Sequence, residues 1–131
     1  MLADRCEELL AVDVSERAVA AARERLSGRG HVTVERRTLP EEMPDGPFDL
    51  IVASEVLYYF PREEMLTVLR GFERELARGG ILLAVHWRRK TETYPLQGDE
   101  VHDLLVKHTR LRNRETIIES DYRLDLFEDG E

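Results

Sequence analysis

The sequence is poor in three features that would assign it to large classes of protein. Its single cysteine, Cys6, excludes an intrachain disulfide and a cysteine metal cluster. No apolar run approaches the roughly 20 residues that span a bilayer, and the first residues lack the basic and apolar regions of an export signal. The net charge of −8 argues against a surface that follows nucleic-acid phosphates. We therefore predict a cytoplasmic protein without membrane or nucleic-acid partners.

The sequence also contains no P-loop, nucleophile elbow or zinc motif. His102 and His108 have no carboxylate or cysteine partners at ligand spacing, so no metal site is predicted. The basic run of residues 88–90 directly follows an apolar segment, and we interpret it as a solvated strand end.

The chain nevertheless has enough apolar residues, 42% of 131, to form one folded domain over residues 1–131. Apolar runs predict strands at 9–13, 32–34, 48–54 and 81–85, of which the run at 48–54 is the clearest candidate for a buried strand. Helical spacing predicts helices after Ser15, from Pro61 to Gly79-Gly80, and from Gly98. Alternating runs around 116–118 and 122–126 predict an antiparallel hairpin, because a parallel crossover needs a longer connection.

This order of elements predicts an α/β fold of the Rossmann-like, doubly wound type. The sheet is expected to be mainly parallel, with an antiparallel carboxy-terminal hairpin. In such sheets ligands bind outside the carboxyl ends of the strands. The residues that follow the four predicted parallel strands are therefore the candidates for a functional site: Asp13, Val14 and Ser15; Thr38 and Leu39; Ser54 to Tyr59; His86 and Trp87.

Asp13 is the sharpest candidate, because a carboxylate at a strand end can accept hydrogen bonds from both hydroxyls of a nucleoside ribose. The alternative is that Asp13 only caps the next helix, a role that Ser15 could share.

The segment 54–59 places a hydroxyl, the carboxylate of Glu55 and two aromatic rings, Tyr58 and Tyr59, at one strand end. This group suits a small polar or cationic ligand, although the rings could instead pack on a helix and Glu55 could cap backbone amides. His86 could accept a proton and Trp87 could wall a pocket, but a lone histidine on an apolar strand is more often structural.

Three motifs taken together resemble the second, fourth and fifth strand motifs of class I S-adenosylmethionine (SAM)-dependent methyltransferases. They are residues 10–15, 48–59 and 79–83. The segments 54–59, 86–88, 94–103 and 122–125 are similar to the nodulation protein S (NodS) branch of that family. This resemblance implies N-methylation of a deacetylated oligosaccharide, another amino sugar or a different small amine, with S-adenosyl-L-methionine as cofactor.

The resemblance also implies roles for individual residues. Asp13 would bind the ribose of SAM, Val14 its adenine or ribose, and Thr38 and Leu39 the edge of the adenine. The acidic residue common at that edge is absent. Ser54 and Glu55 would lie near the methionine part and the acceptor. The residues expected to shape the acceptor pocket are Tyr58, Tyr59, His86 and Trp87, with His86 the first choice for receiving the amine proton and Glu55 the second.

The sequence departs from this family before Asp13, where the expected glycine-rich G-x-G loop does not occur. We expect the strand that precedes that loop to be the missing central one, between residues 9–13 and 48–54. The chain is then either an amino-terminally truncated methyltransferase or a non-catalytic, methyltransferase-like binding or regulatory module. A G-x-G segment encoded in frame upstream of Met1 would favour the enzyme.

Overall fold

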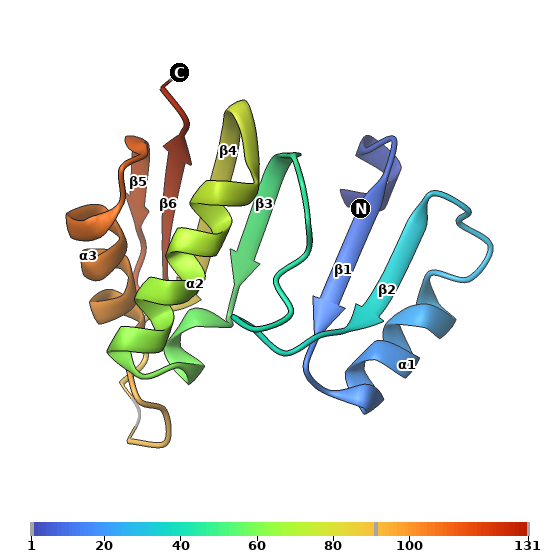
Figure 1. The fold of residues 1–131 in the computed structure, drawn as a ribbon. Coiled ribbons are helices and arrows are strands. Elements are labelled where there is room, and N and C mark those ends of the chain that lie inside the picture. The colour runs from blue at the N-terminus through green and yellow to red at the C-terminus, as the bar shows by residue number, and fades with distance from the viewer. Residues whose placement is uncertain (1, 91, 131) are drawn as a thin grey trace. The chain divides into compact units, whose positions relative to one another are not determined.

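The computed structural model describes residues 2–90 and 92–130. The chain forms two compact units, Met1–Met43 and Pro44–Glu131, and each is described here by itself (Figure 1). The expected single domain over residues 1–131 stays a prediction.

The first unit is a strand–helix–strand motif. Its elements are the 3-10 helix η1 (Leu2–Arg5), β1 (Leu9–Asp13), α1 (Glu16–Arg25) and β2 (Val32–Arg36). β1 and β2 pair in parallel, from Leu9 with Val32 to Asp13 with Arg36. The predicted order of strand, helix and parallel strand is therefore confirmed in this unit.

Helix α1 begins where the sequence predicts it. The Ser15 hydroxyl accepts a hydrogen bond from the Ala18 amide at 3.2 Å, which satisfies one of the free donors in the first turn. Glu16 lies in the first turn and Arg25 in the last, as the helix dipole favours. The buried side chain of Val19 anchors the helix.

The second unit carries a four-stranded mixed sheet. Its elements are β3 (Phe48–Ser54), the 3-10 helix η2 (Leu57–Tyr59), α2 (Arg62–Glu75), β4 (Leu76–Trp87), α3 (Gly98–His108), β5 (Arg112–Ile118) and β6 (Tyr122–Glu128). The strand order is β3-β4-β6-β5, with β3 parallel to β4 and the other pairs antiparallel. The predicted carboxy-terminal hairpin is confirmed as β5 and β6.

The boundary between α2 and β4 differs from the prediction. The helix ends at Glu75 rather than at the glycine pair, because Leu76 has extended backbone angles (φ −72°, ψ 137°) and pairs with Phe48 of β3. The glycines fall inside β4, where Gly79 has φ +74° and the register with β3 shifts. β4 is thus longer than expected and includes His86 and Trp87, although the sequence predicts that they follow the strand.

The sheet of the second unit has a covered face and an open one. α2 and α3 pack on each other and against β4 on the same face (Figure 1), where Leu69, Leu82 and Leu105 are fully buried. On the other face no helix of this unit's described residues covers β3, and Leu50 and Val52 are 43% and 42% exposed. The prediction of a buried strand at 48–54 is therefore wrong for this face, because strand side chains alternate between the two faces.

Candidate functional site

The loop that follows β3 carries a strained residue. Glu55 has φ +53°, a left-handed conformation that costs a residue with a side chain free energy. Its amide donates a 3.0 Å hydrogen bond to the Val85 carbonyl of β4, which fixes the turn against the neighbouring strand. Strain of this kind persists where the surroundings hold it, and here it directs the Glu55 side chain toward the end of β4.

The Glu55 carboxylate is held by two donors. Its Oε1 accepts hydrogen bonds from the Trp87 amide at 3.0 Å and from the Tyr58 hydroxyl. Burial, followed by the hydrogen bond to Glu55 and the charge of that carboxylate, raises the pKa of Tyr58, so the phenol remains a donor across the physiological range. Oε2 makes no hydrogen bond with any other described residue.

Three tyrosines form an aromatic cluster beside this carboxylate. The Tyr58 and Tyr94 rings stack with centroids 5.0 Å apart, and Tyr59 contacts Tyr94 edge-on at 4.5 Å. The Leu96 amide donates to the Tyr58 carbonyl at 3.3 Å, which ties the loop after β4 to the loop after β3. Sequence analysis missed Tyr94 as a site residue, because an irregular loop has no periodicity that would indicate it.

An open pocket of about 550 Å³ lies at this position in the second unit. Its lining residues are Glu55, Tyr58, Trp87, Arg89, Lys90, Tyr94 and Gly98. The predicted residues Glu55, Tyr58 and Trp87 are thus brought together, and Trp87 is 55% exposed. Gly98 admits the close approach of α3 to β4, since a Cβ there would lie 1.9 Å from the Trp87 carbonyl oxygen.

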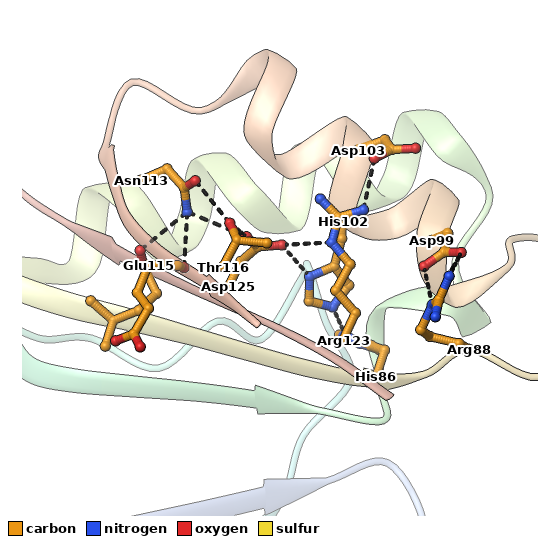
Figure 2. A network of polar contacts seen from close by, with 11 residues as sticks. His86, Arg88, Asp99, His102, Asp103, Asn113, Glu115, Thr116, Arg123 and Asp125 are labelled. Atoms are coloured by element: carbon orange, nitrogen blue, oxygen red, sulfur yellow. Dashed lines mark hydrogen bonds and ion pairs between the residues drawn. The ribbon is translucent and has the colours of Figure 1, made fainter. Parts of the chain in front are cut away.

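A buried relay of hydrogen-bonded side chains runs from β4 to β6 (Figure 2). His86 Nε2 lies 3.1 Å from the Leu57 amide, and its Nδ1 lies 3.0 Å from Nε2 of His102. His102 Nδ1 lies 2.7 Å from Asp125 Oδ2. Both rings and the Asp125 side chain are fully buried, so the chain runs from the loop after β3 through β4 and α3 to β6.

The hydrogen-bond partners determine the tautomers of both rings. His86 Nε2 accepts from a backbone amide, so the proton of the neutral ring is on Nδ1 and is donated to His102 Nε2. His102 then carries its own proton on Nδ1 and donates it to Asp125. Burial, and secondarily the nearby His102, lowers the pKa of His86 to about 3, which keeps the ring neutral.

His86 is therefore poorly suited to the predicted role of amine-proton acceptor. Its side chain is 0% exposed, and both ring nitrogens are already used within the protein. That it contacts the acceptor stays a prediction. In the structure His86 accepts a hydrogen bond from the amide of Leu57, in the loop that carries Glu55 and Tyr58.

Asp125 ends the relay in a polar cluster. Thr116 donates to Oδ1, and Arg123 Nε donates to Oδ2 at 3.1 Å (Figure 2). Burial raises the pKa of Asp125, but the hydrogen bonds from His102 and Thr116 and the charge of Arg123 outweigh it and leave the pKa lowered. Asp125 alternates with Phe127 on the buried face of β6. The sequence gives no signal for this, because Tyr122, Leu124 and Leu126 form the apolar side of the alternation and Asp125 lies on the other side.

Asp13 ends β1 in the first unit and is exposed. Its Oδ1 accepts a 2.9 Å hydrogen bond from the Ser15 amide, while Oδ2 makes none with the described residues. The side chain that caps α1 is that of Ser15. Asp13 contributes to the same turn through Oδ1, and ribose binding by its other oxygen stays a prediction. One carboxylate oxygen braces the turn and the other is available to a ligand.

The other predicted cofactor contacts lie at strand ends of both units. Val14 is 59% exposed beside Asp13. The Thr38 amide, which follows β2, is occupied by a 2.8 Å hydrogen bond to Glu42, and Leu39 is half-buried next to it. Ser54 is exposed at the carboxyl end of β3. Asp13, Val14, Thr38 and Leu39 belong to the first unit, and Ser54 and Glu55 to the second.

Residues 2–90 and 92–130 contain no group of three histidine, cysteine or carboxylate side chains placed to hold a metal ion. None of the helices in the same residues combines the length and the apolar character that crossing a membrane requires.

Comparison with known sequences agrees with the resemblance that the motifs carry. The profile of a family described as a methyltransferase domain matches residues 1–82. Nodulation protein S of Rhizobium tropici is 34% identical over 83 residues, which cover 63% of this chain and 35% of the relative. The match thus spans about a third of the curated relative's length.

Solved structures show the same fold. A candidate methyltransferase from Pseudomonas syringae is 35% identical with a TM-score of 0.84, covering 97% of this chain and 76% of the other. The N-methyltransferase NodS from Bradyrhizobium japonicum WM9, in complex with S-adenosyl-L-homocysteine, is 26% identical with a TM-score of 0.86, covering 99% and 70%. The predicted fold class is confirmed by these neighbours.

Proposed function

Because this chain belongs to the methyltransferase domain family, whose cofactor is S-adenosyl-L-methionine, we propose that it serves methyl transfer from SAM to the nitrogen of a small amine. An amino sugar or a deacetylated oligosaccharide is the proposed acceptor, which the similarity to nodulation protein S supports. The observation that carries the proposal is the Glu55 carboxylate, held in a strained turn at the wall of a pocket with aromatic rings.

The residues of the first unit suit the nucleoside part of SAM. The free Oδ2 of Asp13 is available to the ribose hydroxyls, and the exposed Val14 offers apolar contact beside it. Thr38 and Leu39 are proposed to edge the adenine. Ser54 and Glu55 are proposed to face the methionine part and the acceptor.

The pocket of the second unit suits the amine. SAM supplies both the methyl group and its leaving group, so the protein mainly has to align a neutral nitrogen with an available lone pair. The Glu55 carboxylate would accept a hydrogen bond from the amine and take its proton before or after transfer. Tyr58 and Trp87 would enclose the acceptor, and the exposed Tyr59 would shape the pocket through Tyr94.

The test is product analysis by mass spectrometry after incubation with SAM and glucosamine or a deacetylated chitooligosaccharide. We expect S-adenosyl-L-homocysteine and an acceptor heavier by one methyl group. Glu55→Gln should lower the rate and Lys107→Gln, an exposed change on α3, should not. Failure of every amine tested to become methylated, although SAM binds, would contradict the proposal.

The second candidate function is a methyltransferase-like binding module. It is favoured by the strand pairing, since among the described strands β1 pairs only with β2 and β3 only with β4. Binding of an amine without measurable affinity for SAM in calorimetry would support this alternative.

A further inference from the structure

The pocket in the second unit carries charges of both signs. Its lining includes one carboxylate, Glu55, and two cations, Arg89 and Lys90. The protein as a whole has a net charge of −8, so an excess of positive charge in its pocket is a local feature rather than a reflection of composition. A second positive charge on a ligand would be repelled there, whereas a negative one would be attracted.

The three consecutive cations 88–90 differ in their surroundings. Arg88 is half-buried and paired with Asp99, Nε to Oδ1 at 3.0 Å (Figure 2). It also donates to the Glu119 carbonyl. Arg89 and Lys90 form no ion pair with any carboxylate of the described residues and line the pocket instead. The run follows the end of β4 and its residues Arg89 and Lys90 are exposed, as the sequence predicted, whereas Arg88 is half-buried.

Arg89 is also positioned. Its guanidinium carbon lies 5.4 Å from the centre of the Trp87 ring, in cation–π contact at the pocket wall. A guanidinium held in this way keeps its donors available for an anion, and Arg donors match the oxygens of a carboxylate or a phosphate. The carboxylate of Glu55 and the aromatic rings of Tyr58 and Tyr94 provide the opposite chemistry.

We propose that the pocket binds an amine that also carries an anionic group, with the amine at Glu55 and the anion at Arg89 and Lys90. This inference rests on the proposed function and narrows its acceptor class to zwitterionic or anionic amines. A neutral amino sugar would occupy only the Glu55 side, and a simple anion only the other.

The only tryptophan in the chain, Trp87, lines the pocket, so its fluorescence reports binding without any need for SAM or turnover. The intact 131-residue chain is titrated with four probes: glucosamine, glucosamine phosphate, muramic acid and N-acetylated glucosamine phosphate. We expect glucosamine phosphate to bind roughly tenfold or more tighter than glucosamine, because a charge-assisted pair contributes about 1.5–3 kcal/mol. Muramic acid carries a carboxylate instead of a phosphate. Tight binding of muramic acid would indicate a general anion site, and weak binding would indicate a site that selects phosphate.

The combined variant Arg89→Gln and Lys90→Gln should abolish the preference for glucosamine phosphate and leave the affinity for glucosamine within about twofold. Lys107→Gln, which removes a cation on α3 that does not line the pocket, should keep the preference. Glu55→Gln should weaken glucosamine phosphate but not its N-acetylated form, which lacks the basic amine.

Equal affinities for glucosamine and its phosphate would overturn the proposal, and so would a preference that survives the double variant. N-acetylated glucosamine phosphate binding as tightly as the free amine would overturn the assignment of the amine to Glu55. The proposed methyl transfer is judged separately by product analysis, so its failure would not be mistaken for failure here.

Discussion

Two carboxylates follow parallel strands in this molecule, and their surroundings are very different. Asp13 ends β1, is exposed, and makes a single side-chain hydrogen bond to the amide two residues further along. Glu55 follows β3 in a strained backbone conformation, and its partners come from β4 and from η2. The buried relay from His86 to Asp125 holds the loop that carries Glu55. The relay is not part of the Asp13 turn.

The difference shows two ways of presenting a carboxylate. The Asp13 turn is formed by a few consecutive residues, and its exposed carboxylate suits hydroxyl groups that approach from solvent. The Glu55 loop is preorganised by residues far apart in the sequence, so its geometry depends on the packing of the whole second unit. Changes in the relay should therefore affect the Glu55 side strongly and the Asp13 side little.

The largest effect is expected from Asp125→Ala. This change leaves the buried Nδ1 donor of His102 without its acceptor, and it removes one of the acceptors of Arg123 and of the exposed Thr116. Breaking such a buried pair costs about 3–5 kcal/mol of unfolding free energy. Urea unfolding followed by Trp87 fluorescence and circular dichroism measures it. Asp125→Asn, which keeps one acceptor oxygen, should recover part of the loss. An equal loss of unfolding free energy in Asp13→Ala would contradict the difference between the two carboxylate environments.

On the other side of the comparison, Asp13→Ala should abolish measurable SAM binding, or weaken it at least about 100-fold. Two hydrogen bonds to a charged carboxylate contribute about 1.5–3 kcal/mol each. Calorimetric titration with SAM measures the effect, with Asp4→Ala, another exposed carboxylate of the first unit, as the matched control. Undiminished affinity would remove Asp13 from the cofactor site.

The pH dependence of stability tests the relay directly. The folded pKa of His86, about 3, lies below its ordinary value of 6.5, so the unfolded chain binds an extra proton as the pH falls through 6.5. Stability is then fully present above pH 6.5 and is lost below it, by about 2 kcal/mol between pH 7 and pH 5. His86→Gln should remove this loss in urea titrations, whereas His108→Gln should leave it in place. A wild-type stability that does not change over this range would contradict the lowered pKa of His86.

Local sequence signals predicted the elements well where a short motif defines the structure. The Ser15 cap, the strand ending at Asp13 and the β5–β6 hairpin follow from neighbouring residues, and each was found as expected. The end of α2 was misplaced, because the pairing of Leu76 with Phe48 overrode the helical periodicity and the glycine signal.

The site was predictable only in part, for the same reason. Glu55 and Tyr58 were identified by their place after a strand, but the partners that give them their geometry come from distant segments. His102 lies on the apolar stripe of α3 beside Val101 and Leu105, which indicated burial but not a histidine partner. The contact between His86 and His102 depends on how α3 packs against β4, which no local pattern records.

The smallest expected effect concerns the cap beside Asp13. Ser15→Ala removes the hydrogen bond to the Ala18 amide and should cost about 1 kcal/mol of helix stability. The brace on Asp13 comes from the Ser15 backbone amide rather than its side chain, so SAM affinity should stay within about twofold. Circular dichroism and calorimetry measure the two quantities, with Ser120→Ala in the turn between β5 and β6 as control. A large loss of SAM affinity would mean that the geometry of the Asp13 turn depends on helix α1. The turn would then not be determined by its own few residues alone.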